Sequence, residues 1–182
     1  MQERIYNDKI SKLRSKERIA LLEVERVVEL CLQKLFITKM LDVGTGSGIF
    51  AEAFTLRNLN VTGIDKNPQM VKAASDLVLD AHFKEGSAEQ LPFKKNSFDL
   101  VFLSHVLHES DDPLLVLKEC YRVATSRVAV LEWPCHSEKI GPPIDHRLPP
   151  EKIRTLLRQA GFTEIKKTTL EHMILFRAKP KK

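Results

Sequence analysis

Three glycines alternate with other residues directly after a short apolar run. They are Gly44, Gly46 and Gly48, in the segment MLDVGTGSGIF over residues 40–50. Glycine has no side chain, so a ligand can come close to the backbone where a strand ends and a helix begins. A dinucleotide-binding fingerprint, G-x-G-x-x-G, would place its third glycine at position 49, where this chain has Ile49. The spacing therefore disfavours a nicotinamide-dependent oxidoreductase.

An acidic residue, Asp42, precedes this glycine run. An acidic residue followed by G-x-G-x-G resembles the first motif of the Rossmann-like, S-adenosylmethionine-dependent methyltransferases. The resemblance implies S-adenosyl-L-methionine as cofactor, with S-adenosyl-L-homocysteine as product, and assigns Asp42, Gly44, Thr45, Gly46 and Gly48 to its site. The cofactor carries an ammonium and a sulfonium, so a carboxylate at Asp42 suits it, directly or through water. The alternative is a tight strand-to-helix turn that binds nothing.

A second carboxylate, Asp65, ends the next apolar run. It follows Gly46 at close to the spacing of roughly 20 residues that is typical of a carboxylate on a ribose diol. Two ribose hydroxyls can each donate to one carboxylate, whose charge also repels a 2′-phosphate. We therefore expect Asp65, with Lys66 beside it, at the ribose of the cofactor. The alternative is a charge at the N-terminus of the helix that Asn67 and Pro68 begin.

The segment EGSAEQLPF, over residues 85–93, resembles the third motif of the same family. In that motif a side chain, commonly Asp, and the next backbone N–H contact the adenine. This chain has Ser87 in place of the Asp, and its hydroxyl can accept a hydrogen bond from the adenine amino group more weakly. The resemblance assigns Ser87 and the backbone of Ala88 to the cofactor, and Glu89 fits a solvated loop charge equally well.

The segment SFDLVFLSHVLHE, over residues 97–109, resembles the fourth strand of the family and the loop after it. Ligands of open α/β sheets bind beyond the carboxyl ends of the strands, so Ser104 and His105 are expected within range of the transferred methyl group. His105 is the first candidate to orient the acceptor or accept its proton, because a histidine pKa near ~6.5 suits proton transfer at neutral pH. His146 is the second. The alternative is a histidine that lines the pocket or caps the next helix.

A loop rich in proline, over residues 141–150, precedes the last predicted helix. Long loops at the carboxyl edge of a sheet often carry function, and the alternative is a rigid surface crossover. If the loop is functional, it contributes His146 and Arg147 to the acceptor pocket, together with Glu132 from the end of the fifth strand and residues of the amino-terminal helix.

Two other arrangements of reactive residues are disfavoured by their order. His105, His108 and Glu109 lack the H-E-x-x-H order of zinc proteases, and no metal site is expected. Cys135 beside His136 is a possible nucleophile of a pyrimidine C5-methyltransferase, but no Pro-Cys follows the fourth strand. No Asp/Asn-Pro-Pro-aromatic motif follows that strand either, which disfavours methylation of exocyclic amino groups in DNA or of glutamine side chains.

Short apolar runs alternate with amphipathic stretches, a pattern typical of βαβ units around a parallel sheet. Asn67 and Asp112 each stand before a proline, as a capping side chain does at the start of a helix. Apolar residues at steps of three and four predict one amphipathic helix over residues 16–35 and another that ends at Gly161. The predicted strands cover residues 39–43, 61–65, 82–85, 98–103, 127–132, 162–167 and 171–176.

The resemblance covers roughly residues 38–176. Within the family, the chain is similar to the branch that includes the ubiquinone and menaquinone biosynthesis methyltransferases. It implies a single doubly wound, Rossmann-like α/β domain with helices on both faces of the sheet. The mostly parallel, seven-stranded sheet is expected in the order 3-2-1-4-5-7-6, with the last strand antiparallel. We expect an amino-terminal helical cap over residues 1–37, the methyltransferase domain over 38–178 and a basic tail over 179–182.

Length and composition fit one globular domain. The chain has 182 residues, of which 43% are hydrophobic and 29% charged, as in ordinary globular proteins. No apolar run approaches the ~20 residues of a membrane span, and the amino end shows no secretory signal, so a cytoplasmic location is expected. Cys31, Cys120 and Cys135 form no C-x-x-C pair, which favours reduced thiols.

The function expected from these residues is methyl transfer from the cofactor to a small molecule by in-line displacement. The net charge of +5 is concentrated at the two ends of the chain, so nucleic acid is a minor alternative as partner. The short segment before the first strand would cover only a small acceptor. A methyltransferase acting on RNA or protein, a non-catalytic cofactor-binding module and an NAD-dependent oxidoreductase remain as alternatives, and the sequence specifies neither the acceptor nor the oligomeric state.

Overall fold

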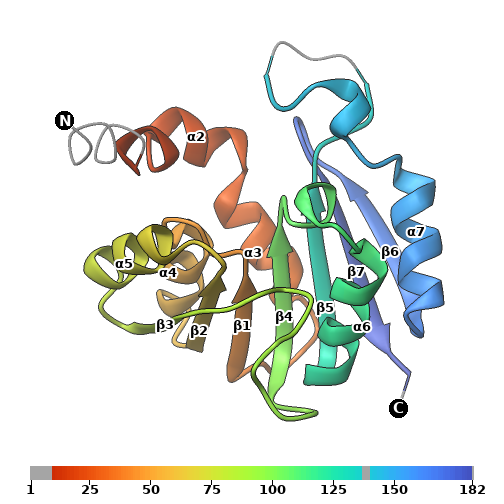
Figure 1. Cartoon of the computed structure of the whole chain (residues 1–182), viewed down its shortest axis with the longest axis horizontal. Helices are drawn as coiled ribbons and strands as arrows, with labels where there is room; N and C mark the ends of the chain where they lie inside the picture. The colour runs from red at the N-terminus through yellow and green to blue at the C-terminus, as the bar shows by residue number, and fades with distance from the viewer. Residues whose placement is uncertain (1–9, 137–139, 182) are drawn as a thin grey trace.

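Seven strands form one sheet in the order β3-β2-β1-β4-β5-β7-β6, in a computed structural model that describes residues 10–136 and 140–181 (Figure 1). β1 pairs in parallel with β2 and with β4. β2 pairs in parallel with β3, and β4 with β5. β7 is antiparallel to both of its neighbours, β5 and β6. The predicted strand order and the antiparallel last strand are therefore confirmed. The strands are β1 (Lys39–Val43), β2 (Asn60–Asp65), β3 (Ala81–Glu85), β4 (Phe98–Ser104), β5 (Ala124–Glu132), β6 (Phe162–Thr169) and β7 (Ile174–Pro180).

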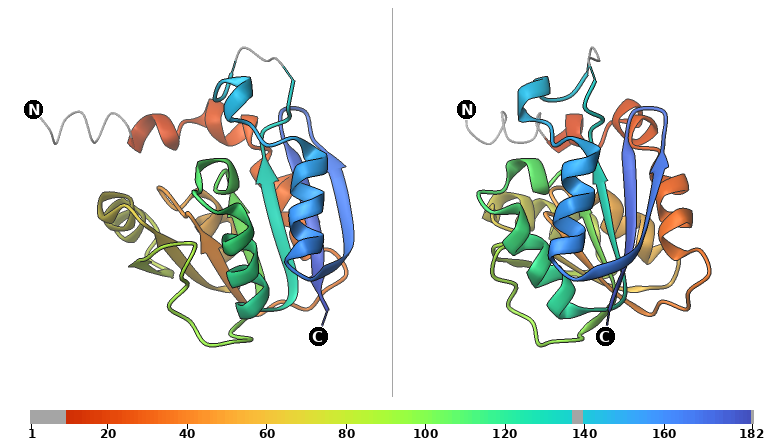
Figure 2. Two further views of the ribbon diagram at one scale, coloured as in Figure 1. Left: turned by 45° about the vertical axis from the view of Figure 1, so that its right-hand side comes forward. Right: turned by 90° about the vertical axis from the view of Figure 1, so that its right-hand side faces the viewer.

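Helices cover both faces of the sheet (Figure 2). α6 and α7 contribute buried side chains to the core on one face, and α3 and α4 to the core on the other. α5 packs against β2 and β3. The helices are α2 (Lys16–Leu21), α3 (Val24–Leu32), α4 (Ile49–Thr55), α5 (Pro68–Leu77), α6 (Pro113–Val123) and α7 (Pro150–Gln159), with short 3-10 turns η1 (Leu107–Glu109) and η2 (Ile144–His146).

The central strand β4 shows why both faces need this cover. Its residues alternate between the two cores: Val101 and Leu103 pack under α6 and α7, and Leu100 and Phe102 under α3 and α4. All four side chains are fully buried. A strand buried on both sides reads as a continuous apolar run, which is the pattern seen in the sequence.

The helix starts follow the predicted caps. The Asn67 side chain accepts a hydrogen bond from the backbone N–H of Gln69 at the start of α5, and Asp112 accepts one from Leu115 at the start of α6. Gly161, after α7, has a φ of 98°, which a residue without a side chain adopts without strain.

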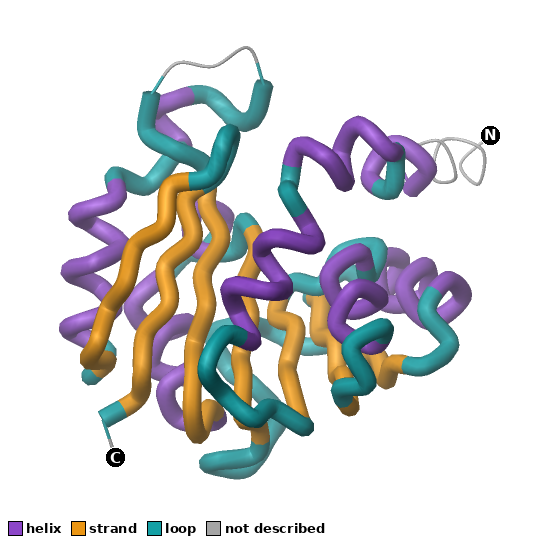
Figure 3. The backbone as a smooth tube through the Cα atoms, turned by 180° about the vertical axis from the view of Figure 1, so that it is seen from behind, coloured by secondary structure: helices purple, strands orange, loops and turns teal. Residues whose placement is uncertain are grey.

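The single helix predicted over residues 16–35 is wrong, because the structure divides it into α2 and α3 (Figure 3). Glu23 lies between them in a left-handed conformation, with a φ of 45°. Its carboxylate accepts from the backbone N–H of Glu171 at 2.6 Å and from the Arg26 guanidinium at 2.7 Å. The break lets α3 pack on the sheet, while α2 extends over the carboxyl ends of the strands (Figure 2).

The end of the chain also differs from the prediction. The last strand is Ile174–Pro180 rather than residues 171–176, because the turn before it closes with a hydrogen bond from Leu170 N to Met173 O at 2.9 Å. β7 therefore includes Lys179 and Pro180, which the sequence had placed in a basic tail. Residues 1–9 of the expected cap and Lys182 lie outside the described residues. Within the described ranges, no helix is long and apolar enough to cross a membrane.

Candidate cofactor and acceptor site

A cavity of about 450 Å³ lies at the carboxyl ends of β1, β2, β3 and β4, beneath α2. Its volume falls within the range of roughly 300–1,000 Å³ that is usual for small-molecule sites. Most of the residues assigned to the cofactor from the sequence line it: Gly44, Thr45, Gly46, Asp65, Lys66, Ser87, Ala88, Ser104 and also His105. Asp42, Gly48 and His146 are not among the lining residues. Segments far apart in the chain therefore meet at the predicted edge of the sheet.

The three glycines after β1 have different surroundings, although each has a positive φ. A Cβ on Gly46 would meet nothing within 4 Å, so this position faces the open cavity. A Cβ on Gly44 would lie 2.5 Å from the Val106 side chain, and one on Gly48 3.2 Å from Val78. Gly46 thus leaves room for a ligand, whereas Gly44 and Gly48 allow close packing of the turn against its neighbours.

The Asp65 carboxylate lies at the end of β2 and faces the cavity. One oxygen accepts from the backbone N–H of Gly46 and the other from that of Asn67, each at 2.9 Å. A carboxylate has about four lone-pair positions, so both oxygens can still accept from a diol. Asp65 is therefore oriented by two backbone donors and available to a ligand. The helix cap that was considered for Asp65 is supplied by Asn67.

Asp42 is buried beneath the glycine turn, with 2% of its surface exposed. It accepts a hydrogen bond of 2.7 Å from the Thr45 hydroxyl. Burial raises the pKa of Asp42 to about 7, with a further contribution from the charge of Asp65, while the bond from Thr45 opposes the rise. Asp42 thus acts on the cavity through Thr45, which lines it, and a contact between Asp42 and the cofactor stays a prediction.

The loop expected at the adenine is tied to the start of α6. The Ser87 hydroxyl accepts from the backbone N–H of Glu89 at 3.2 Å. The Glu89 carboxylate in turn accepts from the backbone N–H of Asp112 at 3.1 Å and lines the cavity. Glu89 therefore joins two loops at the edge of the cavity, which the sequence did not show.

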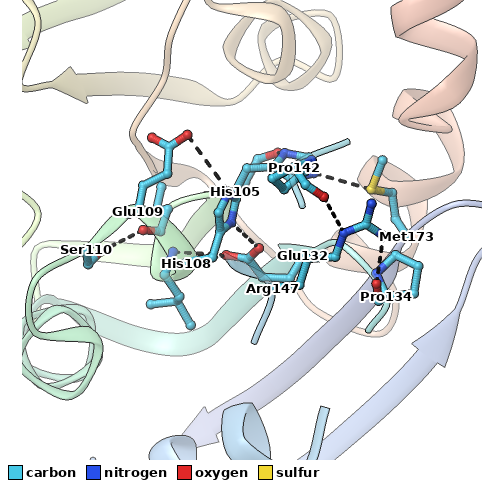
Figure 4. Close-up of polar contacts among 12 residues, drawn as sticks. His105, His108, Glu109, Ser110, Glu132, Pro134, Pro142, Arg147 and Met173 are labelled. Atoms are coloured by element: carbon cyan, nitrogen blue, oxygen red, sulfur yellow. Dashed lines mark hydrogen bonds and ion pairs between the residues drawn. The ribbon is translucent and has the colours of Figure 1, made fainter. Parts of the chain in front are cut away.

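His105 follows β4 with a φ of 61°, a left-handed conformation that is uncommon outside glycine (Figure 4). Its Nδ1 lies 2.8 Å from the Ser104 hydroxyl and its Nε2 3.3 Å from the Met173 sulfur. Burial lowers the pKa of His105 to about 3, and the charges of Arg18 and His108 act in the same direction. The expected pKa near 6.5 is therefore wrong, and His105 is an uncharged, weakly basic group at neutral pH.

Glu132, at the end of β5, is bonded within the protein and is not free to contact the methyl acceptor (Figure 4). Its two oxygens accept from the backbone N–H of Leu107 at 3.0 Å and pair with Nδ1 of His108 at 2.7 Å. Only 2% of the Glu132 side chain and 7% of the His108 side chain are exposed. Burial lowers the pKa of His108, but the hydrogen bond and charge of Glu132 outweigh it and raise that pKa above its ordinary value. The pair fixes the loop that carries His105.

Arg147 is also engaged within the protein rather than in the acceptor pocket. Its guanidinium lies 5.3 Å from the centre of the Trp133 ring, and the residue is 6% exposed. It donates hydrogen bonds to the backbone carbonyls of Pro134, His136, Ile140 and Pro142. Arg147 thus holds the proline-rich loop together, and His146 is exposed on that loop. The structure therefore supports the alternative of a rigid crossover.

The amino-terminal helix was expected to contribute to the acceptor pocket, but the sequence did not specify which residues α2 and the segment before it bring to the cavity. Leu13, Arg18 and Leu22 line it from above. Arg14 anchors this segment, because it donates to the backbone carbonyl of Ser47 at 2.7 Å and forms an ion pair with Glu52. An amphipathic pattern predicts a helix, but it does not show that the helix crosses the glycine turn.

Comparison with known proteins gives matches over part of the chain. Residues 41–130 match the family described as methyltransferase domain. Over 112 residues the chain is 35% identical to a demethylmenaquinone methyltransferase of Thermotoga maritima, which covers 59% of this chain and 48% of that protein. Over 93 residues it is 36% identical to a ubiquinone biosynthesis O-methyltransferase of Pseudomonas putida, which covers 47% of this chain and 39% of that protein. The chain thus spans half or less of the length of these curated relatives.

Solved structures share the fold over nearly the whole chain. A SAM-dependent methyltransferase from Aquifex aeolicus superposes with a TM-score of 0.86 at 24% identity, covering 96% of this chain and 98% of that one. The PH0226 protein from Pyrococcus horikoshii gives a TM-score of 0.78 at 18% identity, covering 93% of each chain. At these identities the likeness establishes the fold.

Proposed function

We propose, on the premise that residues 41–130 belong to the methyltransferase domain family, that this chain binds S-adenosylmethionine in the cavity and transfers its methyl group to a small molecule. The observation that carries the proposal is the arrangement of Gly46 and Asp65. Gly46 leaves open space toward the cavity, and its backbone N–H orients the Asp65 carboxylate beside that space. A flat, diol-bearing ligand is what such a pair accommodates.

The residues around the cavity fit the parts of this cofactor. Asp65 and Lys66 would meet the ribose, Ser87 and Ala88 the adenine, and the turn of Gly44, Thr45 and Gly46 the methionine end. Ser104 lies at the end of β4, next to β1 in the sheet, where the methyl group would face the acceptor. When bound, S-adenosylmethionine would supply an electrophilic methyl group on a positively charged sulfur, suited to in-line transfer to a lone pair of the acceptor.

The contribution of the protein is mainly proximity and orientation. His105 accepts a proton poorly because its pKa lies at about 3. It therefore lines the acceptor site as an uncharged group that can form hydrogen bonds. An acceptor that is already ionised, or that loses its proton to water, needs no base from the protein. We assign His146 no part in the reaction, since it does not line the cavity.

A small acceptor agrees with the size of the site. The cavity must hold both cofactor and acceptor in about 450 Å³ beneath α2. The names of the two relatives above, which refer to quinone biosynthesis, also support a small-molecule acceptor. Methylation of folded RNA or protein would need an open approach from above, where Arg14 anchors the segment before α2 to the glycine turn.

Two measurements test this proposal. Calorimetry is expected to detect S-adenosylhomocysteine and no comparable affinity for NADH, and the reverse order would point to an oxidoreductase. Transfer of a labelled methyl group from S-adenosylmethionine into fractionated metabolite extract is expected to label a small molecule. Cofactor binding with no labelled product in any fraction, together with a protein partner recovered by pull-down, would favour a non-catalytic binding module.

A further inference from the structure

We propose that Arg18 binds an anionic oxygen of the methyl acceptor, so that the substrate class is a small molecule carrying a carboxylate or an ionised hydroxyl. The inference rests on the proposed function, because it assigns the acceptor side of the same cavity. It concerns a residue that no sequence motif marked.

Arg18 is held over the cavity by its own helix. The Ser15 side chain accepts from the backbone N–H of Arg18 at 3.2 Å and so caps the start of α2. One residue earlier, Arg14 joins the segment to Ser47 and Glu52. The Arg18 side chain then turns back to line the cavity, and its guanidinium lies 5.6 Å from the centre of the Trp133 ring.

The charge of Arg18 lacks a carboxylate partner within the described part of the chain. Three other arginines near the amino end have one: Arg14 pairs with Glu52, Arg26 with Glu23, and Arg57 with Glu25. Arg18 is partly buried, and this burial lowers its pKa. A desolvated cation that lines a cavity is stabilised by an anion, and a guanidinium matches a carboxylate or phenolate with paired N–H donors.

The position of Arg18 favours the acceptor over the cofactor. Trp133, on which the guanidinium lies, follows β5, and His105, whose ring lies 5.2 Å from Trp133, follows β4. β5 is separated from β1 and its glycine turn by β4. The Arg18 guanidinium thus lies against the end of β5, two strands away from the turn that would hold the methionine end, and it is Arg14 that contacts that turn.

The acidic residues that line the cavity on the loop after β4 do not favour a cationic acceptor. Glu109 and Asp111 border it on the loop after β4, but both are exposed, with 68% of the Glu109 side chain open to solvent. Water screens such charges, so they attract a cationic acceptor weakly. His105 is uncharged at neutral pH, so the positive charge on this side of the cavity comes from Arg18.

Calorimetry on the protein saturated with S-adenosylhomocysteine tests the proposal with benzoate as the anionic probe and benzamide as its neutral counterpart. We expect saturable binding of benzoate and none of benzamide at the same concentrations. Arg18→Gln should weaken benzoate at least tenfold and up to about a hundredfold, the effect of losing hydrogen bonds to a charged group. Arg18→Lys should recover part of the affinity, and Arg158→Gln, which removes an exposed arginine of α7, should change nothing.

The fluorescence of Trp133 gives a second measurement of binding, because it is the single tryptophan of the chain and Arg18 lies against it. Benzoate should change its emission in the wild type and in Arg158→Gln but not in Arg18→Gln. Absent or equal binding of benzoate and benzamide by the saturated wild type would overturn the proposal. So would an Arg18→Gln variant that loses S-adenosylhomocysteine but keeps benzoate, since Arg18 would then bind the cofactor. Failure of the wild type to bind S-adenosylhomocysteine would instead contradict the proposed function itself.

Discussion

The backbone N–H of Gly46 donates a hydrogen bond of 2.9 Å to the carboxylate of Asp65. This bond joins the turn after β1 to the end of β2, two strands that pair side by side in the sheet. It orients the carboxylate toward the space that the missing side chain of Gly46 leaves open. The two residues therefore depend on each other in shaping this part of the cavity.

Gly46→Val should abolish binding of S-adenosylhomocysteine while leaving the sheet folded. A Cβ at this position would enter open space rather than a packed neighbour, and a φ of 54° is strained for a branched side chain. Gly48→Ala is the contrasting variant, because its Cβ would press on Val78 and Ala74 at 3.2 and 3.3 Å, outside the cavity. It should lower the free energy of unfolding and change cofactor affinity less. Calorimetry with circular dichroism separates the two effects, and retained binding in Gly46→Val would remove the glycine turn from the site.

The Asp42→Asn variant should gain stability relative to the wild type as the pH rises. The quantity that grows is the difference between their free energies of unfolding. The pKa of Asp42 is raised from 3.8 to about 7 in the folded state by burial. The folded protein therefore binds more protons than the unfolded chain between these values, so wild-type stability falls as pH rises through this window and levels off above it. The cost reaches about 4 kcal/mol at most, at roughly 1.4 kcal/mol per unit of pKa.

Urea denaturation of wild type and Asp42→Asn between about pH 5 and pH 8 checks this. The asparagine keeps an acceptor for the Thr45 hydroxyl, so the comparison isolates the charge. Parallel pH profiles for the two proteins would show that Asp42 titrates in its ordinary range.

His105→Ala should lower kcat by less than tenfold on the acceptor identified by the labelling experiment. A group with a pKa of about 3 is a poor proton acceptor at neutral pH, whereas a true general base contributes about 10² to 10⁴. Affinity for S-adenosylhomocysteine should stay nearly unchanged, and His146→Ala serves as the exposed control. A loss of a hundredfold or more in His105→Ala, with a titration near neutral pH that the variant lacks, would restore His105 as the base.

Glu132→Gln should destabilise the protein by about 3 to 5 kcal/mol, the cost of leaving one member of a buried ion pair without its partner. The pKa of His108 is raised in the folded state, so its contribution is fully present below the unfolded value and is lost as pH rises through the raised value. The difference from wild type should therefore be largest at mildly acidic pH. Glu171→Gln, which alters a carboxylate with 77% of its side chain exposed, is the matched control. Equal denaturation midpoints for Glu132→Gln and wild type would mean that the pair does not support the loop after β4.

The sequence predicted those parts of the site that depend on one strand and the turn after it. Gly46 and Asp65 were found because each stands where an apolar run ends, and parallel strands bring such ends to one edge. His105 lines the cavity for the same reason, but its lowered pKa was not predicted, since burial and the charge of Arg18 come from outside its own segment.

Features that depend on distant partners were missed. The break at Glu23 is held by Glu171, from the turn between β6 and β7, and the apolar spacing on either side of Glu23 gives no sign of it. Because of that break, α2 extends over the cavity and brings Arg18 to it. Glu132 and Arg147 were assigned to the acceptor on position alone, whereas His108 and four backbone carbonyls hold them within the protein.

Titration of S-adenosylhomocysteine into wild type, Asp65→Ala and Asp76→Ala by calorimetry measures directly whether the Asp65 carboxylate binds the cofactor. Asp76 pairs with Lys72 on the exposed face of α5 and controls for the loss of a carboxylate. The account predicts binding by the wild type and Asp76→Ala, and a loss of about 1.5 to 3 kcal/mol in folded Asp65→Ala, the scale of hydrogen bonds to a charged group. Undetectable binding by the wild type, or equal affinity in Asp65→Ala, would contradict it.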